Sequence, residues 1–252
     1  MAIMTNKEFI AKLQHIVDSY KTVYMWGVFG APVTESLISA KAKQYPDWYT
    51  SERQASFRKL IGQGYFGFDC VNLIKGILWG WNGDMTATYG GAKYASNGVP
   101  DTNADGMIKL CNDISTDFNN ILPGEALWVP GHIGVYIGDG LAIECTPRWS
   151  NNVQVTAVGN IGKKAGYNIR TWHQHGKLPF IDYVEDKPEP EKTEPALDNT
   201  PDAYAVKAVG WAIDNKLIVG DGRGDYMLHQ NITRQDMLVI LERFYNFIKS
   251  GK

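Results

Sequence analysis

The sequence carries one cysteine in a setting where a thiol could act as a nucleophile. Cys70 follows Asp69 and precedes an apolar segment whose spacing predicts a helix, so the thiol would lie at the helix N-terminus. A thiol attacks as the thiolate, a form that both the helix N-terminus and a nearby histidine favour. A glycine-flanked histidine, His132, and an acid, Glu144, follow later in the chain. These three residue types form a thiol, imidazole and carboxylate relay, which predicts a cysteine hydrolase.

Two predicted strands follow, and their hydrophobic pattern indicates how they pair. Residues 131–137 and 141–146 alternate apolar and polar side chains, and the intervening residues 138–140 are a strong hairpin signal. A three-residue loop at 138–140 pairs Val135 with Ile143 and gathers the branched apolar side chains on one face. A two-residue loop would mix apolar and polar residues on both faces, so we expect the three-residue loop.

This pairing places His132 and Glu144 together on the polar face. They become diagonal neighbours across Gly134, which leaves room between the two side chains. Cys145 falls on the apolar face and Cys111 lies in an amphipathic segment, so both are interpreted as small buried hydrophobic residues. An isolated cysteine before an apolar helix is usually structural. The convergence of a histidine and an acid at one hairpin favours the catalytic interpretation for the remaining cysteine.

The motifs around these residues resemble those of the NlpC/P60 peptidoglycan hydrolases. The resemblance is carried by Tyr24-Met25-Trp26-Gly27, by Asp69-Cys70 at a helix start, and by the strands within 123–138, and it spans residues 1–184. It implies an α+β, papain-like fold in which helices pack on an antiparallel sheet.

The resemblance also implies roles for the three reactive side chains. Cys70 would be the nucleophile, His132 the general base and then acid, and Glu144 the third residue that orients the imidazole. The sequence departs from the common pattern at two places: Val71-Asn72 stands where Ser-Gly is frequent, and Glu144 stands where a histidine is frequent. A carboxylate would fix the tautomer of His132 and stabilise the imidazolium more strongly than a neutral partner.

Five further residues are expected to line the site by the same resemblance. They are Tyr24, Trp26, Asp69, Trp172 and His173. The last two belong to a segment that is similar to the endings of phage endolysins in this family. We therefore expect a phage endolysin that hydrolyses amide bonds in peptidoglycan, with an endopeptidase acting on the stem peptide as the first choice. An N-acetylmuramoyl-L-alanine amidase, an acyl transferase and a catalytically inactive wall-binding protein are the alternatives.

Composition and charge exclude several other classes of function. The chain has 252 residues, 44% of them hydrophobic, and a net charge of −2 without a basic block, so no nucleic-acid partner is expected. No apolar run is long enough to span a bilayer, so no membrane insertion is expected. Residues 5–8 predict a capping box that opens an amphipathic helix rather than a signal peptide. We expect synthesis in the cytoplasm of the host bacterium and action on the wall after release.

The chain is predicted to contain a catalytic domain, a linker and a small helical module. The catalytic domain covers 1–184 and includes an unusually long stretch between residues 30 and 64, interpreted as an inserted helical arm beside the cleft. Alternating prolines and acids predict an extended linker at 185–199. The remainder, 200–252, predicts two amphipathic helices, at 203–215 and from 233. The second helix is expected to bury the apolar residues Met237, Leu238, Ile240, Leu241 and Phe244.

The module resembles a single surface-layer homology unit, which binds wall polysaccharide. By that resemblance Tyr204, Gly220 and Arg234 would contact the glycan. Such units usually act in threes, so we expect a homo-oligomer, a trimer, through this module. The alternative is a helical hairpin that packs on its own catalytic domain.

No resident metal is expected. Asp101, Asn103 and Asp105 match the first half of a calcium loop, but the bidentate glutamate is missing and helix capping by Asn103 explains the same pattern. Calcium at these three residues is kept as a minor alternative. His173 and His175 lack further zinc ligands nearby and are expected to line or flank the cleft. His229 is expected to be a surface residue without partners.

Overall fold

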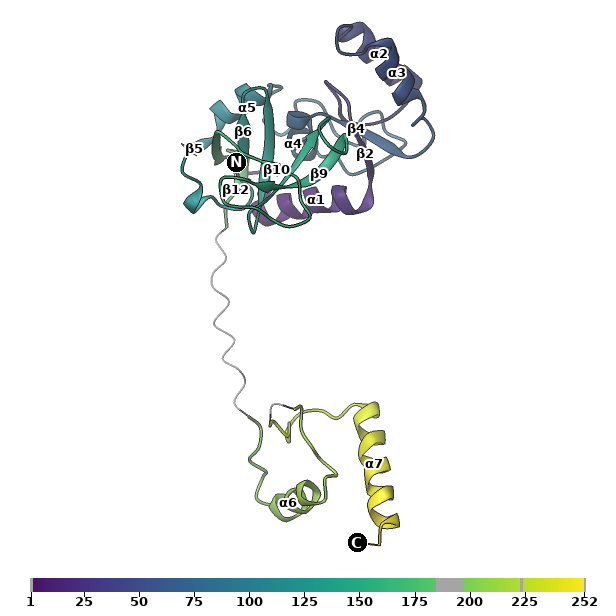
Figure 1. Ribbon diagram of the computed structural model, residues 1–252, viewed down its shortest axis with the longest axis vertical. Helices are drawn as coiled ribbons and strands as arrows, with labels where there is room; N and C mark the ends of the chain where they lie inside the picture. The colour runs from purple at the N-terminus through teal and green to yellow at the C-terminus, as the bar shows by residue number, and fades with distance from the viewer. Residues whose placement is uncertain (1, 185–196, 223, 252) are drawn as a thin grey trace. The chain divides into compact units, whose positions relative to one another are not determined.

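The computed structural model describes residues 2–184, 197–222 and 224–251. The chain divides into two compact units, and the division falls between residues 185 and 186. Most of the predicted linker lies outside the described residues, which include only 197–199 of it. The first unit combines helices and strands in the α+β fold that the sequence predicts (Figure 1).

The first unit is built on a seven-stranded sheet. Its strands lie in the order β10 (Ile169–Arg170), β9 (Asn152–Val158), β8 (Leu141–Thr146), β7 (His132–Gly138), β6 (Ala126–Val129), β11 (Gln174–Lys177) and β5 (Asn112–Ser115). Neighbouring strands are antiparallel, except that β10 runs parallel to β9. A smaller sheet joins β2 (Lys21–Tyr24), β4 (Tyr65–Phe68) and β3 (Phe29–Pro32), and β1 (Met4–Thr5) pairs with β12 (Ile181–Asp182).

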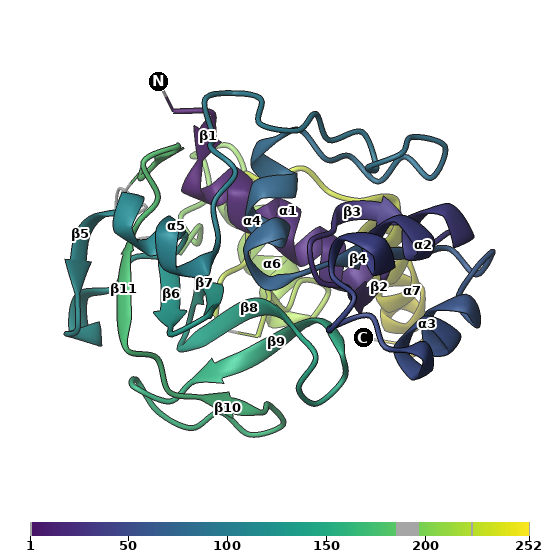
Figure 2. The same cartoon turned by 90° about the horizontal axis from the view of Figure 1, so that it is seen from above.

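Each helix of the first unit begins directly after a residue whose side chain accepts a hydrogen bond from the first turn. They are α1 (Asn6–Ser19), α2 (Glu35–Gln44), α3 (Ser51–Arg58), α4 (Cys70–Leu78), α5 (Ala104–Leu110) and the short 3-10 helix η1 (Phe118–Asn120). The predicted capping box of α1 is confirmed, since Thr5 and Glu8 bond to each other's backbone N–H groups. All nine residues of α4 are buried, and the helix packs against β3, β7 and β8 (Figure 2).

The hairpin of β7 and β8 confirms the predicted register and revises the predicted loop. Val135 pairs with Ile143, as the alternation of side chains requires. The turn itself is the two-residue Asp139-Gly140, because Gly138 pairs with Leu141 and a bulge restores the register beyond it. Both turn residues have positive φ, at 51° and 71°, which suits a tight hairpin turn. The bulge provides the extra residue that the hydrophobic pattern demands.

The two faces of this hairpin belong to different parts of the core. Ile133, Val135, Ile143 and Cys145 join the main core. On the opposite face, the core around Tyr136 and Ala142 includes Phe118, Ile121, Leu127, Val158 and Trp172. The polar face that the sequence predicts is therefore itself covered, which takes His132 and Glu144 largely out of water.

Helices α2 and α3 confirm that the long stretch between residues 30 and 64 forms a helical arm (Figure 1). Its residues Ile38, Tyr49 and Phe57 share a small core with Val23 of β2 and Ala31 of β3. Tyr49 donates a hydrogen bond to the carbonyl oxygen of Trp26 at 2.8 Å, which ties the arm to the segment that follows β2. The arm is thus fixed beside the residues expected to line the site.

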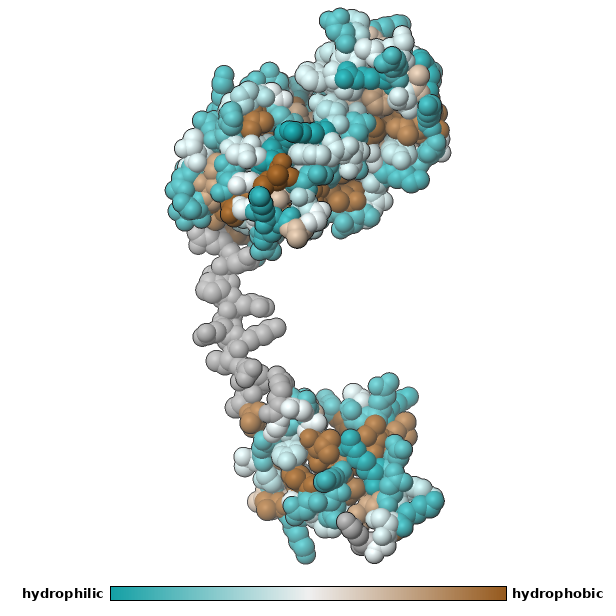
Figure 3. Space-filling view, in the orientation of Figure 1, coloured by the Kyte–Doolittle hydropathy of each residue, from teal (hydrophilic) through white to brown (hydrophobic). Residues whose placement is uncertain are grey.

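The second unit contains α6 (Val206–Asp214) and α7 (Arg234–Lys249). The capping box of Thr233 and Asp236 at the start of α7 is confirmed. The predicted burial along α7 is wrong: Met237, Leu238, Leu241 and Phe244 are 46%, 64%, 54% and 41% exposed. The apolar pattern correctly marks one face of the helix, but little within the described part of this unit covers that face (Figure 3). Across the described residues, no helix is both long and apolar enough to cross a membrane.

His229 in this unit does have partners, contrary to expectation. Its Nδ1 lies 2.5 Å from a carboxylate oxygen of Asp198, and its Nε2 lies 3.5 Å from Asp202. A hydrogen bond from His229, followed by the charge of Asp198, raises the pKa of the imidazole.

Candidate active site

Cys70 opens α4 and lies in the wall of a cavity of about 660 Å³. Its side chain is nearly buried, with 7% of the residue exposed. Burial and then the charge of Asp69 raise the pKa of the thiol to about 12, although the backbone N–H groups of Ile133 and Val71 act in the opposite direction. Desolvation thus outweighs the effect of the helix N-terminus on this pKa. A thiol with a raised pKa needs a base before it can attack.

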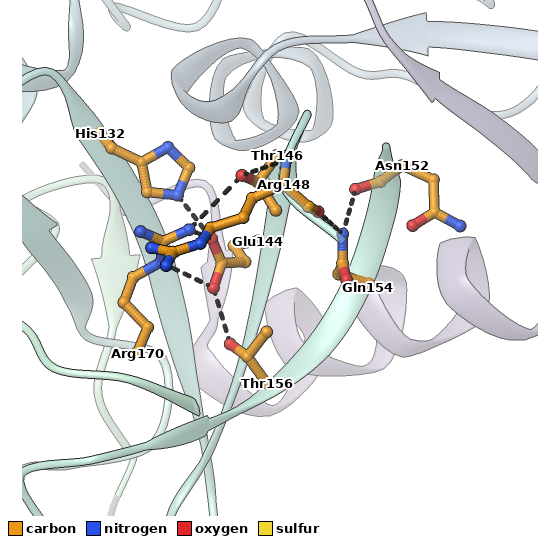
Figure 4. A network of polar contacts seen from close by, with 8 residues as sticks. All are labelled: His132, Glu144, Thr146, Arg148, Asn152, Gln154, Thr156 and Arg170. Atoms are coloured by element: carbon orange, nitrogen blue, oxygen red, sulfur yellow. Dashed lines mark hydrogen bonds and ion pairs between the residues drawn. The ribbon is translucent and has the colours of Figure 1, made fainter. Parts of the chain in front are cut away.

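His132 lies on the strand that packs against this helix. Helix α4 packs against β7, and the backbone N–H of Ile133, the residue after His132, lowers the pKa of the Cys70 thiol. The His132 Nε2 atom lies 2.6 Å from Oε2 of Glu144 (Figure 4). Since an ionised carboxylate only accepts hydrogen bonds, Nε2 is the donor of this pair, and Nδ1 is the ring nitrogen left for another partner.

Trp172 holds the imidazole from another side. Its ring lies nearly parallel to that of His132, with an interplanar angle of 14° and a centroid distance of 5.7 Å. Gly134 makes this packing possible, since a Cβ there would lie 2.9 Å from the Trp172 ring and 3.2 Å from Cβ of Glu144. Trp172 is only 2% exposed, so it supports His132 and is not an exposed substrate contact.

Glu144 lies at the centre of a closed polar network (Figure 4). It is fully buried, and Thr156 Oγ1 donates to its Oε1 at 2.8 Å. Arg170 Nε lies 3.0 and 2.9 Å from the two carboxylate oxygens, and its Nη2 lies 2.8 Å from Oε2. Burial alone would raise the pKa of the carboxyl, but hydrogen bonds from His132 and Arg170 outweigh it and lower the pKa. Glu144 is an ionised carboxylate at neutral pH.

Sequence reasoning does not assign a role to Arg170. It lies at the end of a two-residue strand, 26 positions from Glu144, with no periodic pattern to mark it. The one available signal is Glu144, because a buried carboxylate requires a counter-ion and hydrogen-bond donors, and this predicts a basic partner somewhere in the chain.

Asp69 joins the two N-terminal motifs. One carboxylate oxygen accepts from the N–H of Asn72 at 2.8 Å and caps α4, and the other accepts from the N–H of Gly27 at 2.8 Å. Burial raises the pKa of this carboxyl despite these bonds. Tyr24 and Trp26 line the same cavity as Cys70, with Tyr24 buried and Trp26 45% exposed. Asp69 therefore positions the helix that carries the thiol. Tyr24 and Trp26 line the cavity around the thiol.

The other two predicted histidines lie away from the cavity. His173 is exposed beside Trp128, and its ring lies 6.2 Å from that indole. His175 is buried and bonded to Glu125 through Nδ1 and to the carbonyl oxygen of Asp117 through Nε2. The expectation that His175 lines the cleft is wrong, because its buried ring packs against Phe118 at a centroid distance of 4.9 Å and does not line the cavity.

Two further segments line the cavity. Helix α2 and the residue after it contribute Lys41, Gln44 and Tyr45, and the loop between α4 and α5 contributes Tyr89 and Tyr94. The expected helical arm beside the cleft therefore supplies part of the cleft wall.

The acidic residues of the cavity are bonded to protein donors. Asp101 pairs with the buried Lys75 and accepts from Tyr94 Oη at 2.7 Å. Asn103 caps α5, and Asp105 accepts from Trp128 Nε1 and Gly131 N at 2.8 and 2.7 Å. The three residues considered for calcium thus serve three separate bonding roles. Among the described residues, no group of three histidine, cysteine or acidic side chains could hold a metal ion.

No family model matches the chain, and no curated protein matches it. Among solved structures it is similar to NlpC1 from Trichomonas vaginalis, with a TM-score of 0.36 and 12% identity over 68% of this chain and 44% of that chain. It is similar to the peptidoglycan hydrolase RipB from Mycobacterium tuberculosis, with a TM-score of 0.36 and 16% identity over 71% and 67%. It is also similar to the P60 domain of antigen MAP1204 from M. avium subspecies paratuberculosis, with a TM-score of 0.36 and 17% identity over 71% and 98%. The chain spans less than half the length of the Trichomonas structure.

Proposed function

We propose that the first unit is a cysteine hydrolase that cleaves amide bonds in bacterial peptidoglycan. One observation carries this proposal: His132 holds its Nε2 against the buried Glu144 at 2.6 Å, which leaves Nδ1 to deprotonate the thiol at the start of α4. The wall as substrate is supported by the motifs at Tyr24–Gly27, Asp69-Cys70 and 123–138, which resemble those of the NlpC/P60 hydrolases.

The reaction would proceed in two halves. Cys70 Sγ attacks the amide carbonyl carbon while its proton moves to His132 Nδ1 and the carbonyl electron pair moves to oxygen. The oxygen then re-forms the carbonyl, the C–N bond breaks, and the imidazolium gives its proton to the leaving amine. In the second half, water attacks the thioester with His132 as base, which releases a carboxylic acid and restores the thiol.

Lys41 favours the stem peptide as the part of the wall that is bound. The other basic side chain lining the cavity, Lys75, is paired with Asp101, whereas Lys41 has no carboxylate partner among the described residues. Its Nζ donates to Gln44 Oε1 at 3.0 Å, and partial burial lowers the pKa of its ammonium group. An unpaired cation in a cleft attracts a carboxylate, which stem peptides carry. This observation favours an endopeptidase.

The exposed aromatic residues of the cavity favour the second candidate, an N-acetylmuramoyl-L-alanine amidase. Trp26 and Tyr94 are 45% and 60% exposed and both line the cavity. Flat exposed rings suit the apolar face of a sugar, which an amidase would hold beside the scissile bond.

Mass spectrometry of digested purified peptidoglycan distinguishes the two candidates. An endopeptidase yields fragments cut within the stem peptide, whereas an amidase yields complete stem peptides and peptide-free glycan. Wall material that stays intact after prolonged incubation with folded protein would contradict both.

We further propose that the chain is a phage endolysin whose second unit binds wall polysaccharide and associates into trimers. Tyr204 is 90% exposed, and Gly220 has φ +71° with only 2.4 Å between an added Cβ and the Asp225 carbonyl oxygen, so a glycine is required there. The uncovered apolar face of α7 supports association between copies. Sedimentation of the full chain should give a trimer, and Arg234→Ala should weaken wall binding; a monomer that binds wall would contradict the association.

A further inference from the structure

Glu144 creates a difficulty for the reaction that the structure also resolves. A buried carboxylate 2.6 Å from an imidazole favours the charged form of that imidazole, since opposite charges attract strongly where water is excluded. An imidazole that already carries the proton cannot accept another from Cys70. A glutamate in the third position would therefore block the base unless its own charge were offset.

Arg170 provides that offset. It contacts both oxygens of Glu144, at 3.0 and 2.9 Å through Nε and at 2.8 Å through Nη2. Its guanidinium carbon lies 5.2 Å from the Trp149 ring centre and 5.4 Å from that of Trp172, so two indoles hold it in place. The guanidinium keeps its charge at any pH at which the protein folds.

The remaining charged groups near His132 come from four elements and from Arg148, which follows β8 in the same network (Figure 4) and whose guanidinium carbon lies 5.0 Å from the Trp149 ring centre. Helix α4 contributes Cys70 and the capping carboxyl Asp69, and α5 contributes Asp105, which accepts from the N–H of Gly131. Strand β8 contributes Glu144 and β10 contributes Arg170. With the Glu144 and Arg170 charges cancelled, a charged imidazole would be a buried cation with no net counter-charge in the network, which is unfavourable.

We propose that Arg170 is a positioning residue that cancels the charge of Glu144, so that His132 rests uncharged and Cys70 rests as a thiol until substrate binds. Glu144 then orients the imidazole through its hydrogen bond without protonating it in advance. The pKa of the Cys70 thiol, raised to about 12 by burial and Asp69, agrees with a protonated resting state. The proposal rests on the proposed role of Cys70 as nucleophile, but its test requires no peptidoglycan.

The test is the rate at which iodoacetamide alkylates Cys70 between pH 6 and 10, followed by peptide mass mapping so that Cys111 and Cys145 are counted separately. In Arg170→Gln, the carboxylate is no longer offset, His132 takes up a proton, and the imidazolium stabilises the thiolate. We expect Cys70 to be alkylated at least about tenfold faster at pH 7 than in the wild type, the equivalent of about one pKa unit. Arg170→Lys keeps the charge and should behave as the wild type.

A second variant covers the case in which Arg170→Gln fails to fold. Glu144→Gln leaves the guanidinium unopposed, so Cys70 should be alkylated more slowly than in the wild type. General loosening of the site would speed alkylation in both variants. The proposal is overturned if Arg170→Gln reacts no faster than the wild type, if Arg170→Lys reacts as fast as Arg170→Gln, or if Glu144→Gln accelerates the reaction. Continued wall hydrolysis by Cys70→Ala would instead overturn the proposed function.

Discussion

Two histidine–glutamate pairs lie in or beside the seven-stranded sheet, and they differ at the second ring nitrogen. His132 uses Nε2 for Glu144 at 2.6 Å, which leaves Nδ1 for another partner. His175 uses Nδ1 for Glu125 and Nε2 for the carbonyl oxygen of Asp117 at 2.8 Å. Both partners of His175 are oxygen acceptors, so neither of its ring nitrogens is left for a further partner. The same two residue types therefore leave one ring nitrogen available in one place and form a closed structural link in the other.

The glutamates of the two pairs also differ in their further partners. Glu144 meets Arg170 and Thr156, whereas Glu125 accepts from the N–H of Leu122 at 3.3 Å. The guanidinium offsets the charge of the first carboxylate and helps to lower its pKa. The comparison teaches that the surroundings of a pair, more than its composition, determine whether it can do acid–base chemistry.

The largest effect should come from His132→Ala. Without the imidazole no group takes the thiol proton, so kcat for wall hydrolysis should fall about 10³-fold or more. His173→Ala is the matched control, because this exposed histidine, unlike His132, has no carboxylate partner in the described part of the chain, and it should keep the wild-type rate. Equal losses in the two variants would contradict the assignment.

Glu144→Gln should come next. The glutamine can keep a hydrogen bond to His132 but cannot balance the imidazolium, so kcat should fall about 10²- to 10⁴-fold with little change in KM. Steady-state kinetics on a soluble wall fragment measures both constants. A change confined to KM would mean that Glu144 contacts substrate instead.

Glu125→Gln tests the same comparison at the second pair, Glu125 and His175. The pair with His175 is structural, so this variant should lose about 1–3 kcal/mol of unfolding free energy through one impaired buried hydrogen bond. At temperatures where it is folded, its kcat should equal that of the wild type. Denaturant unfolding and kinetics on the same sample decide it, and a fall in kcat comparable to that of Glu144→Gln would remove the distinction between the pairs.

Lys41→Met should have a smaller effect, on specificity. If the ammonium binds a stem-peptide carboxylate, kcat/KM for wall peptides should fall about tenfold, the worth of one charge-assisted hydrogen bond. Lys43→Met, on an exposed position of the same helix outside the cavity, should leave kcat/KM unchanged. A peptide whose carboxylate is amidated should not distinguish the wild type from Lys41→Met.

The smallest effect is expected at His229, the exposed counterpart of the buried pairs. Asp198 raises its pKa, so the interaction stabilises the folded second unit fully below the unfolded value and is lost as the pH rises through the raised value. An NMR titration of the full chain should place the His229 midpoint above the ordinary histidine range. In Asp198→Asn the midpoint should move down; an unchanged midpoint would show that the ion pair does not form in solution.

The sequence predicts the parts of the site that depend on local periodicity. Side-chain alternation gives the pairing of Val135 with Ile143, and with it the shared face of His132 and Glu144. The cap at Asp69 follows from its place before an apolar helix. The bulge between Tyr136 and Gly138 is not visible in the pattern, because a bulge and a longer loop restore the same alternation.

The parts that depend on contacts between distant segments cannot be read from the sequence. The Cys70 thiol is desolvated by strands some 60 positions away, so its raised pKa has no local signal. The predicted burial along α7 is wrong for a related reason. An amphipathic pattern shows which face of a helix is apolar, but not whether another part of the protein covers that face. Both features depend on burial, which is a property of the whole fold.

The most direct test of the central claim is the rate at which free amino groups appear when purified peptidoglycan is incubated with the full chain and with single-cysteine variants. Cleavage of any wall amide by this mechanism frees one amine, whichever bond is chosen. Cys70→Ala should release none above the background while unfolding at the wild-type temperature, and Cys111→Ala and Cys145→Ala, once shown to be folded, should release amines at the wild-type rate. Release by Cys70→Ala at the wild-type rate would contradict the account.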